Sequence, residues 1–235
     1  MRLDKYVTLA LFVSRKDAKR LIISKKIQVF KDNYLINAGI DYDVTAEDVY
    51  YNDERIYASE YIYIMMNKPS GYISSTEEKR QKCVLDLIGA YKTRKLGIVG
   101  RLDIDTEGLL IITDDGVLIH KLTSPKIGHE KKYYVKTDKR FNEDDIESFR
   151  SGVYILVNGE KYLTKPAKLE IIDGNAAYLT ITEGKFHQIK LMVEAVGKHV
   201  TYLKRVEING LKLDSALKLG EYRLLSSEEI ETLKK

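Results

Sequence analysis

Short apolar runs that end at turn residues constrain most strongly what this 235-residue chain can fold into. The runs 167–172 and 177–181 flank a turn of Asp, Gly and Asn at 173–175, which is typical of a β-hairpin. Helical patterns, such as 187–196 before Gly197, occur singly between the strand-like runs. Hairpin signals interleaved with single helices predict an α+β fold with a largely antiparallel sheet.

Other elements of this fold follow from the same periodicities and from helix-capping residues. Asn142 can cap one helix, and Ser226 with Glu229 can cap a closing one. On these patterns we expect strands over 61–66, 109–113, 133–136 and 200–208, and helices over 84–92, 142–149 and from Ser226 onward.

The first part of the chain has a pattern of its own. Leu3, Val7 and Leu11 recur at helical spacing, and Ser14 with Asp17 forms a capping pattern that opens a second helix. Short strand-like pieces follow. Two short helices and small strands bury little apolar surface. We therefore predict a small α/β module over residues 1–58 and a larger domain over 61–235.

Basic residues gather in this first module. The whole chain carries a net charge of +4, but up to Lys31 there are nine basic residues against Asp4 and Asp17. A clustered basic face is typical of phosphate binding. An ordinary solvated helix face explains the cluster equally well on composition alone. The side chains expected to project from the second helix are Arg15, Lys16, Lys19 and Arg20.

Composition excludes several classes of protein. No apolar run has the length that spans a bilayer, and the N-terminus has no apolar signal core. The single cysteine, Cys83, excludes an internal disulfide and a cysteine-based metal cage. We expect a cytoplasmic protein with no metal and no membrane partner.

An acid-rich loop at 100–108 stands directly before the apolar run 109–113. Loops held by a rigid sheet are common places for catalytic groups, and Gly100 and Gly108 allow unusual backbone conformations or close approach. Most acid-rich loops are nevertheless only solvated turns, and the loop's composition alone favours that simpler interpretation.

Sequence motifs favour the catalytic interpretation. Gly100-Arg101-Leu102-Asp103, with Asp105-Thr106 and Gly108-Leu109, resembles the signature loop of the pseudouridine synthases. An ordered series of further segments resembles the RsuA-like branch of that family. These segments are 66–72, 113–116, 122–125, 130–135, 163–167, 183–190 and 220–223. Residues 2–6, 13–18 and 27–29 resemble the RNA-binding module of a small-subunit ribosomal protein, which we call the S-four-like module.

The resemblance implies a catalytic role for three residues. Asp103 matches the family's essential aspartate and would act as nucleophile or as base, and the sequence does not decide between these. Tyr133 matches a tyrosine that stacks on the uracil and takes part in proton transfer. Lys190 matches a basic residue that pairs with the aspartate and favours its ionised form. The conversion of uridine to pseudouridine that the resemblance implies needs no redox step, so no cofactor is expected.

The resemblance also implies RNA contacts outside this set. Arg101 would fill the gap left when the target base flips out, although a phosphate contact fits Arg101 as well. Lys204 and Arg205, in the strand expected over 200–208, would contact RNA or simply face solvent at a strand edge. His187 and Gln188 are expected to be structural or to contact RNA, because the sequence shows no acidic partner for the histidine.

The resemblance implies a specific uridine of 16S ribosomal RNA, free or in an assembling small subunit, as substrate, and we expect a monomer. A target in 23S ribosomal RNA stays open. So does a non-catalytic RNA-binding protein for ribosome assembly, although it would lack the active-site set. A third alternative is a metal-dependent nuclease whose ligands would be Asp103, Asp105, Asp114 and Asp115.

Overall fold

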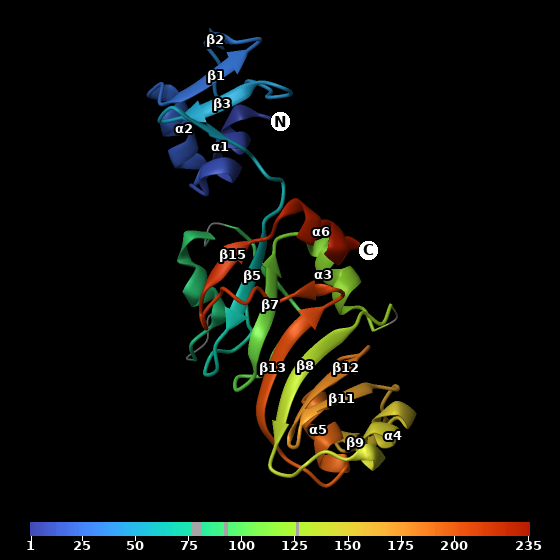
Figure 1. Ribbon diagram of the computed structural model, residues 1–235. Helices are drawn as coiled ribbons and strands as arrows, with labels where there is room; N and C mark the ends of the chain where they lie inside the picture. Colours follow the sequence, from blue (N-terminus) through green and yellow to red (C-terminus); the bar gives the residue numbers. More distant parts are fainter. Residues whose placement is uncertain (77–80, 92–93, 126) are drawn as a thin grey trace. The chain divides into compact units, whose positions relative to one another are not determined.

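The computed structural model describes residues 1–76, 81–91, 94–125 and 127–235 (Figure 1). Contacts divide the chain into two compact units. The first comprises Met1–Ile62 and Gly89–Lys95, and the second comprises Tyr63–Ile88 and Leu96–Lys235. In the described residues no helix is long and apolar enough to cross a membrane.

The first unit consists of two helices packed on a small antiparallel sheet. Its strand order is β2-β1-β3-β4, and one apolar cluster that includes Leu3, Val7, Ile22 and Val49 joins helices to strands. Ser14 accepts a hydrogen bond from the backbone of Asp17, as the capping pattern predicted. The elements are α1 (Leu3–Leu11), α2 (Arg15–Ile23), β1 (Ile27–Lys31), β2 (Tyr34–Ile36), β3 (Asp48–Tyr51) and β4 (Glu54–Ile56).

Segment 89–95 belongs to this first unit although it follows the start of the second. The ring of Tyr91 packs edge-on against Phe12, with 4.7 Å between centroids. Arg94 donates a hydrogen bond to the carbonyl of Glu60 at 2.7 Å. A truncation near residue 60 would therefore remove the packing partners of this segment, and point substitutions are the cleaner way to examine the first unit.

The second unit is built on one mixed sheet with the strand order β11-β12-β8-β13-β7-β5-β15. Neighbours are antiparallel except β13 and β7, which are parallel; β14 pairs with β13, and β6 with β7. The predicted α+β fold is confirmed. The strands are β5 (Tyr63–Lys68), β6 (Gly97–Val99), β7 (Glu107–Thr113), β8 (Lys131–Thr137), β11 (Lys168–Asp173), β12 (Ala176–Ile181), β13 (Val200–Ile208), β14 (Leu211–Lys212) and β15 (Tyr222–Leu224).

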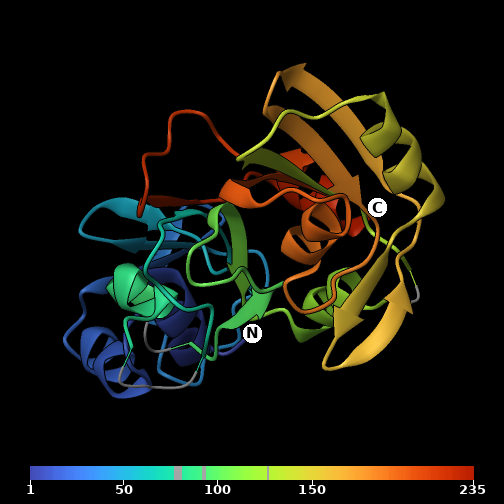
Figure 2. The same ribbon diagram turned by 90° about the horizontal axis from the view of Figure 1, so that it is seen from below.

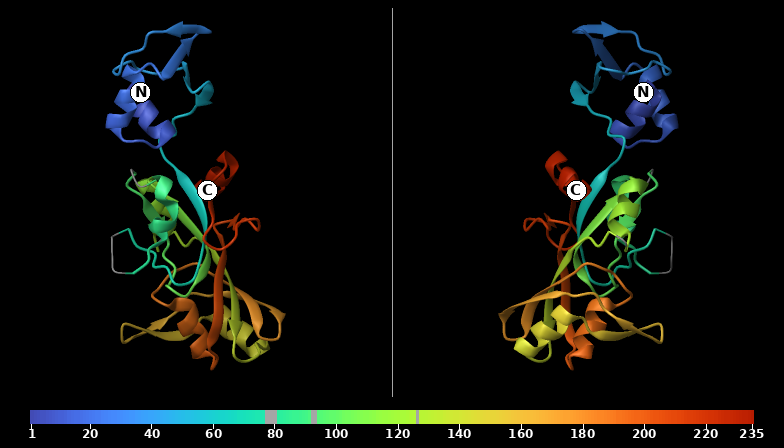
Figure 3. Two further views of the ribbon diagram at one scale, coloured as in Figure 1. Left: turned by 90° about the vertical axis from the view of Figure 1, so that its left-hand side faces the viewer. Right: turned by 90° about the vertical axis from the view of Figure 1, so that its right-hand side faces the viewer.

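Helices pack beside this sheet, and a separate hairpin packs against helix α5. Helix α4 packs beside β11 (Figure 2), and α5 lies beside β13 in both side views (Figure 3). A separate antiparallel pair, β9 with β10, was not predicted, although Asn158-Gly159 between the two strands is a hairpin signal. The elements are α3 (Gly116–Thr123), α4 (Glu143–Ser151), β9 (Tyr154–Val157), β10 (Glu160–Leu163), α5 (Gln188–Ala195) and α6 (Ser227–Lys234).

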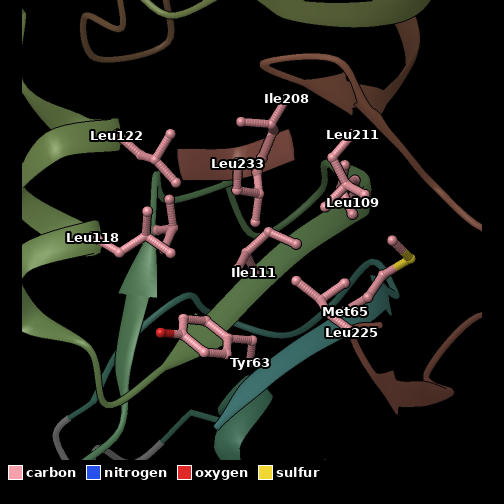
Figure 4. Close-up of a cluster of buried hydrophobic side chains, with 11 residues drawn as sticks. Tyr63, Met65, Leu109, Ile111, Leu118, Leu122, Ile208, Leu211, Leu225 and Leu233 are labelled. Carbon is pink, nitrogen blue, oxygen red and sulfur yellow. The ribbon is translucent and has the colours of Figure 1, made fainter. Parts of the chain in front are cut away.

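Buried side chains from α3, α6 and the central strands form one apolar cluster (Figure 4). Leu109 and Ile111 of β7 belong to it, together with Leu118 of α3 and Leu233 of α6. Every residue of β5 is buried. β7 and β5 therefore form a rigid base for the acidic loop that leads into β7.

Two expectations about individual elements need correction. The helix expected over 84–92 is a 3-10 helix, η1 (Val84–Tyr91), interrupted at Ile88, where φ −114° and ψ 42° are not helical; Lys92 lies outside the described residues. The strand expected over 61–66 begins at Tyr63 and continues through Lys68, because its last residues still pair with β7.

Candidate active site

A cavity of about 920 Å³ opens in the second unit around the acidic loop. Its walls come from the loop at 100–106, from β8 and β13, and from the turn and helix at 183–190. The loop enters β7 at Gly108, whose φ is +100°. A Cβ there would lie 2.2 Å from the carbonyl oxygen of Arg205, so only glycine allows β7 and β13 to approach this closely.

Two buried cations fix the shape of the loop. Lys68 is 0% exposed, and its ammonium donates to the carbonyls of Thr106 at 2.8 Å, Asp103 at 3.0 Å, Pro69 at 3.1 Å and Ile104 at 3.3 Å. Burial lowers the pKa of Lys68 to about 8, although Asp105 and Asp103 oppose that shift. A network of this kind orients the backbone on both sides of Asp103.

Arg205 is the second buried cation. Its guanidinium donates to the carbonyls of Leu109 and Gly100, each at 2.8 Å, and the side chain is 1% exposed. Burial lowers the pKa of Arg205, and the neighbouring Tyr133 hydroxyl opposes that shift. Arg205 thus ties the start of the loop to the start of β7.

The Asp103 carboxylate lies beside two basic side chains. Lys190 Nζ is 3.2 Å from Asp103 Oδ2, and His187 Nε2 is 3.7 Å from Asp103 Oδ1. The expected pairing of Asp103 with Lys190 is therefore present in the geometry. The approach of His187 to the same carboxylate was not expected, because no acidic partner for this histidine is visible in the sequence.

Lys190 is shared between two carboxylates. Its ammonium lies 2.7 and 2.9 Å from the two oxygens of Asp105, closer than to Asp103. Burial alone would lower the pKa of Lys190, but Asp105 and Asp103 together raise it above its ordinary value. Burial opposes ionisation of Asp105, yet the bond from Lys190 lowers the pKa of that carboxyl. Lys190 is consequently cationic and Asp105 anionic at neutral pH.

Tyr133 lies in the cavity wall, and its neighbour Tyr134 does not. Tyr133 is 7% exposed on β8, opposite Arg205 of β13. Tyr134 points to the other face of the sheet, where its ring contacts Tyr178 and Tyr202 at centroid distances of 5.8 and 6.1 Å. The geometry thus brings Asp103, Lys190 and Tyr133 to one cavity.

Comparison with known proteins identifies the family of this chain. The model of the family described as RNA pseudouridylate synthase matches residues 62–195. The RNA pseudouridine synthase YtzG of Bacillus subtilis is 43% identical over 239 residues, covering 99% of this chain and 98% of the relative. The ribosomal small subunit pseudouridine synthase A of Escherichia coli K12 is 41% identical over 235 residues, covering 99% and 100%.

The chain belongs to the RNA pseudouridylate synthase family. A crystal structure of a pseudouridylate synthase superposes with a TM-score of 0.68 at 36% identity and covers 99% of both chains. The protein is thus an RsuA-like pseudouridine synthase, an isomerase of uridine in RNA, as the motifs predicted.

The RNA contact expected of Arg205 in this pseudouridine synthase needs correction. A guanidinium that is 1% exposed and bonded to two backbone carbonyls does not reach an RNA phosphate at a strand edge. Its neighbour Lys204 is partly exposed and stays a prediction. Arg101 is exposed and lines the cavity, so it stays a prediction as well.

The alternative of a metal-dependent nuclease has no support in the geometry. Across residues 1–76, 81–91, 94–125 and 127–235, no group of three His, Cys, Asp or Glu residues could hold a metal ion. Asp115 instead caps α3 by accepting from Leu118 N at 3.0 Å and also accepts from the Tyr63 hydroxyl at 2.8 Å. Asp115 therefore has a structural explanation away from the Asp103 loop.

The basic residues of α2 fall into two groups. All four are exposed, but Arg15 contacts the buried Asp4 at 3.2 Å and Arg20 contacts Asp17 at 3.3 Å. Among the described residues no acidic side chain lies within ion-pair distance of Lys16 or Lys19. Lys16 and Lys19 are therefore the cations of this helix that are most available to an RNA phosphate.

Proposed function

We propose that this pseudouridine synthase isomerises a specific uridine of 16S ribosomal RNA, with Asp103 as the catalytic carboxylate. The observation that carries this proposal is the contact between Asp103 and the cationic Lys190, 3.2 Å apart in a cavity that Tyr133 also lines. A nucleophile or a base requires the ionised carboxylate, and the Lys190 ammonium would balance its negative charge in the cavity. The full-length similarity to the small-subunit enzyme of E. coli supports 16S RNA as substrate.

The proposed chemistry needs little beyond these groups. The bond from the ribose C1′ to N1 of uracil breaks, the base turns, and a bond from C1′ to C5 forms. C5 then loses its proton and N1 gains one, so atoms and electrons balance without an oxidant. Asp103 acts on the sugar as nucleophile or base, and the Tyr133 ring stacks on the uracil while the base is out of the RNA stack.

Substrate capture is assigned to surface cations. Lys16 and Lys19, supported by Arg15 and Arg20, would contact RNA phosphates from the first unit. Lys204, on the sheet face opposite the cavity, would contact the RNA backbone, and Arg101, in the cavity wall, would occupy the gap left by the flipped base. We take the enzyme to act as a monomer, and work on ribosomal RNA would place it in the cytoplasm.

An in vitro assay tests the proposed substrate. Purified enzyme is incubated with unmodified 16S or 23S transcripts, or with partly assembled small subunits, and pseudouridine is mapped by nucleotide. We expect one modified position in 16S RNA, with the particle as the better substrate if the target is shaped during assembly. Modification of 23S RNA alone would overturn the 16S assignment. Loss of activity in a chelator would revive the metal alternative.

A further inference from the structure

An exposed pair of stacked rings stands at the edge of the cavity. The rings of Phe186 and His187 lie parallel, with 3.8 Å between centroids and 18° between planes. Phe186 is 64% exposed although it is apolar, and both residues line the cavity. His187 Nε2 is 3.7 Å from Asp103 Oδ1, so the pair begins beside the reacting carboxylate and extends outward.

Hydrogen bonds to a buried carboxylate hold the turn that carries these rings. The buried carboxylate of Glu183 accepts from the Tyr162 hydroxyl at 2.6 Å, from Gln188 Nε2 at 2.7 Å and from the backbone of Lys165 at 3.0 Å. The amide oxygen of Gln188 in turn accepts from the backbone of Lys185 at 2.8 Å. Both ends of the 184–187 turn are thereby fixed to one hydrogen-bonded hub.

The backbone of His187 adds a second sign of a built arrangement. Its φ of 50° and ψ of 26° lie in the left-handed region, which is unfavourable for a residue with a Cβ. Such a conformation persists only where the surroundings enforce it, and it often occurs at ligand-binding sites. Here it lies at the N-cap of α5, where the turn that carries the two stacked rings enters the helix.

We propose that the Phe186–His187 ring pair is a stacking platform for the RNA base next to the target uridine. This inference rests on the proposed function, because it takes Asp103 as the place where the target nucleotide reacts. Tyr133, in the cavity wall, is assigned to the target uracil, so the outer ring pair is left for a neighbour. Exposed aromatic rings in a basic setting are how proteins hold single-stranded bases, and Lys131, Lys165 and Lys185 line the same cavity.

The platform also predicts a sequence preference. Stacking strength grows with the area of the base that overlaps the ring, so a purine next to the target uridine should bind better than a pyrimidine. No hydrogen-bond reading of that base is needed. The platform is therefore a source of specificity that differs from the reading of the uracil itself.

Kinetics with short RNA fragments test the platform. The fragments are ones that the wild-type enzyme converts, from whichever ribosomal RNA they come, so an error in the 16S assignment leaves this test intact. Phe186→Leu keeps an apolar side chain and removes the π-face. We expect its KM to rise about 5- to 150-fold, the range of base–aromatic stacking, with kcat nearly unchanged. Phe186→Tyr keeps the ring and should behave like wild type.

Two controls make the outcome specific. Tyr154 on β9 is a comparably exposed aromatic, 58% exposed and outside the cavity wall, and Tyr154→Leu should leave KM unchanged. The second control is RNA that lacks the base on one side of the target. With wild-type enzyme its KM should rise by the same factor that Phe186→Leu causes, and with Phe186→Leu the missing base should raise KM little further. An unchanged KM for Phe186→Leu would overturn the platform. So would losses from the substitution and from the missing base that multiply in full, whichever neighbouring base is missing. Either result would leave the 16S proposal standing.

Discussion

The two units of this pseudouridine synthase hold their cations in opposite ways. On α2 of the first unit, Lys16 and Lys19 are exposed, and among the described residues no carboxylate is close enough to pair with either. In the second unit, Lys68 and Arg205 are almost completely buried and bind backbone carbonyls of the Asp103 loop. Exposed charges attract RNA at a distance, whereas buried charges fix the geometry of a loop.

This difference has consequences for how each group of cations should respond to substitution. Exposed cations should act independently of one another, and salt should screen them. Buried cations should be insensitive to salt, and their removal should leave carbonyl groups without partners. Lys190 lies between these extremes, because it is partly exposed but ion-paired beside Asp103.

Among these cations, the largest effect is expected at Lys190. Lys190→Met removes the cation beside Asp103, and we expect the single-turnover rate at saturating RNA to fall about 10²-fold or more. The matched control is Asp105→Asn, which removes the other carboxylate partner of the lysine and should cost less than about tenfold. Equal losses in the two variants would mean that Asp105 is as important to the chemistry as the Lys190 charge.

Lys68 should affect stability more than chemistry. Lys68→Met leaves four carbonyl oxygens without their donor, and we expect the free energy of unfolding to drop by about 2 kcal/mol. Urea denaturation of the purified variant measures this drop, with Lys218→Met in an exposed loop as control. A wild-type midpoint for Lys68→Met would show that the buried ammonium does not hold the loop.

Activity should also fall at alkaline pH through Lys131. Burial, together with nearby Arg205, lowers the pKa of this lysine, which lines the cavity, to about 8, although Glu183 opposes the shift. The charge is therefore present below about pH 8 and lost above it, so kcat/KM for RNA should decline several-fold as the pH rises from 8 to 10. Lys131→Arg keeps its charge and should reduce that decline, leaving the part that comes from Lys68, whose pKa burial also lowers to about 8. A pH profile of Lys131→Arg identical to wild type would assign the decline to another group.

The smallest effect concerns the exposed lysines of α2. Each neutralised phosphate contributes roughly 0.7 to 0.9 to the slope of log affinity against log salt, so Lys16→Ala with Lys19→Ala should make the slope shallower by about one to two units. The loss should be similar for target and unrelated structured RNA. The matched control, Lys234→Ala with Lys235→Ala, removes two exposed charges elsewhere and should leave the slope unchanged. If both double variants behaved alike, α2 would not be a docking surface.

Local signals in the sequence were enough to predict much of the fold. The strand expected over 200–208 coincides with β13, since apolar residues and the Asn209-Gly210 turn define both its pattern and its end. Asn142 and Ser226 begin helices as capping residues, each with a reciprocal hydrogen bond. These elements depend on neighbours within a few residues, which a sequence displays directly.

Contacts between distant segments set the rest, and apart from the pairing of Asp103 with Lys190, which the family resemblance implied, these were missed or wrong. Lys68 binds carbonyls about 35 residues away, and nothing in its own motif indicates that partner. Arg205 was expected to contact RNA, yet it lies on the same side of β13 as the buried Leu203, as the two-residue period of a strand could have shown. The ion pair between Asp105 and Lys190 forms because the fold brings the acidic loop next to α5.

Mapping pseudouridine in cells tests the central claim most directly. A strain that lacks this protein is complemented with wild type, Asp103→Asn or Asp105→Asn, and modified positions in ribosomal RNA are mapped. Removing the charge at Asp103 while keeping its shape should abolish the chemistry. We expect one pseudouridine in 16S RNA to disappear in the deletion strain, to return with wild type and with Asp105→Asn, and to stay absent with Asp103→Asn. Restoration of that pseudouridine by Asp103→Asn would contradict the assignment of Asp103 as the catalytic carboxylate.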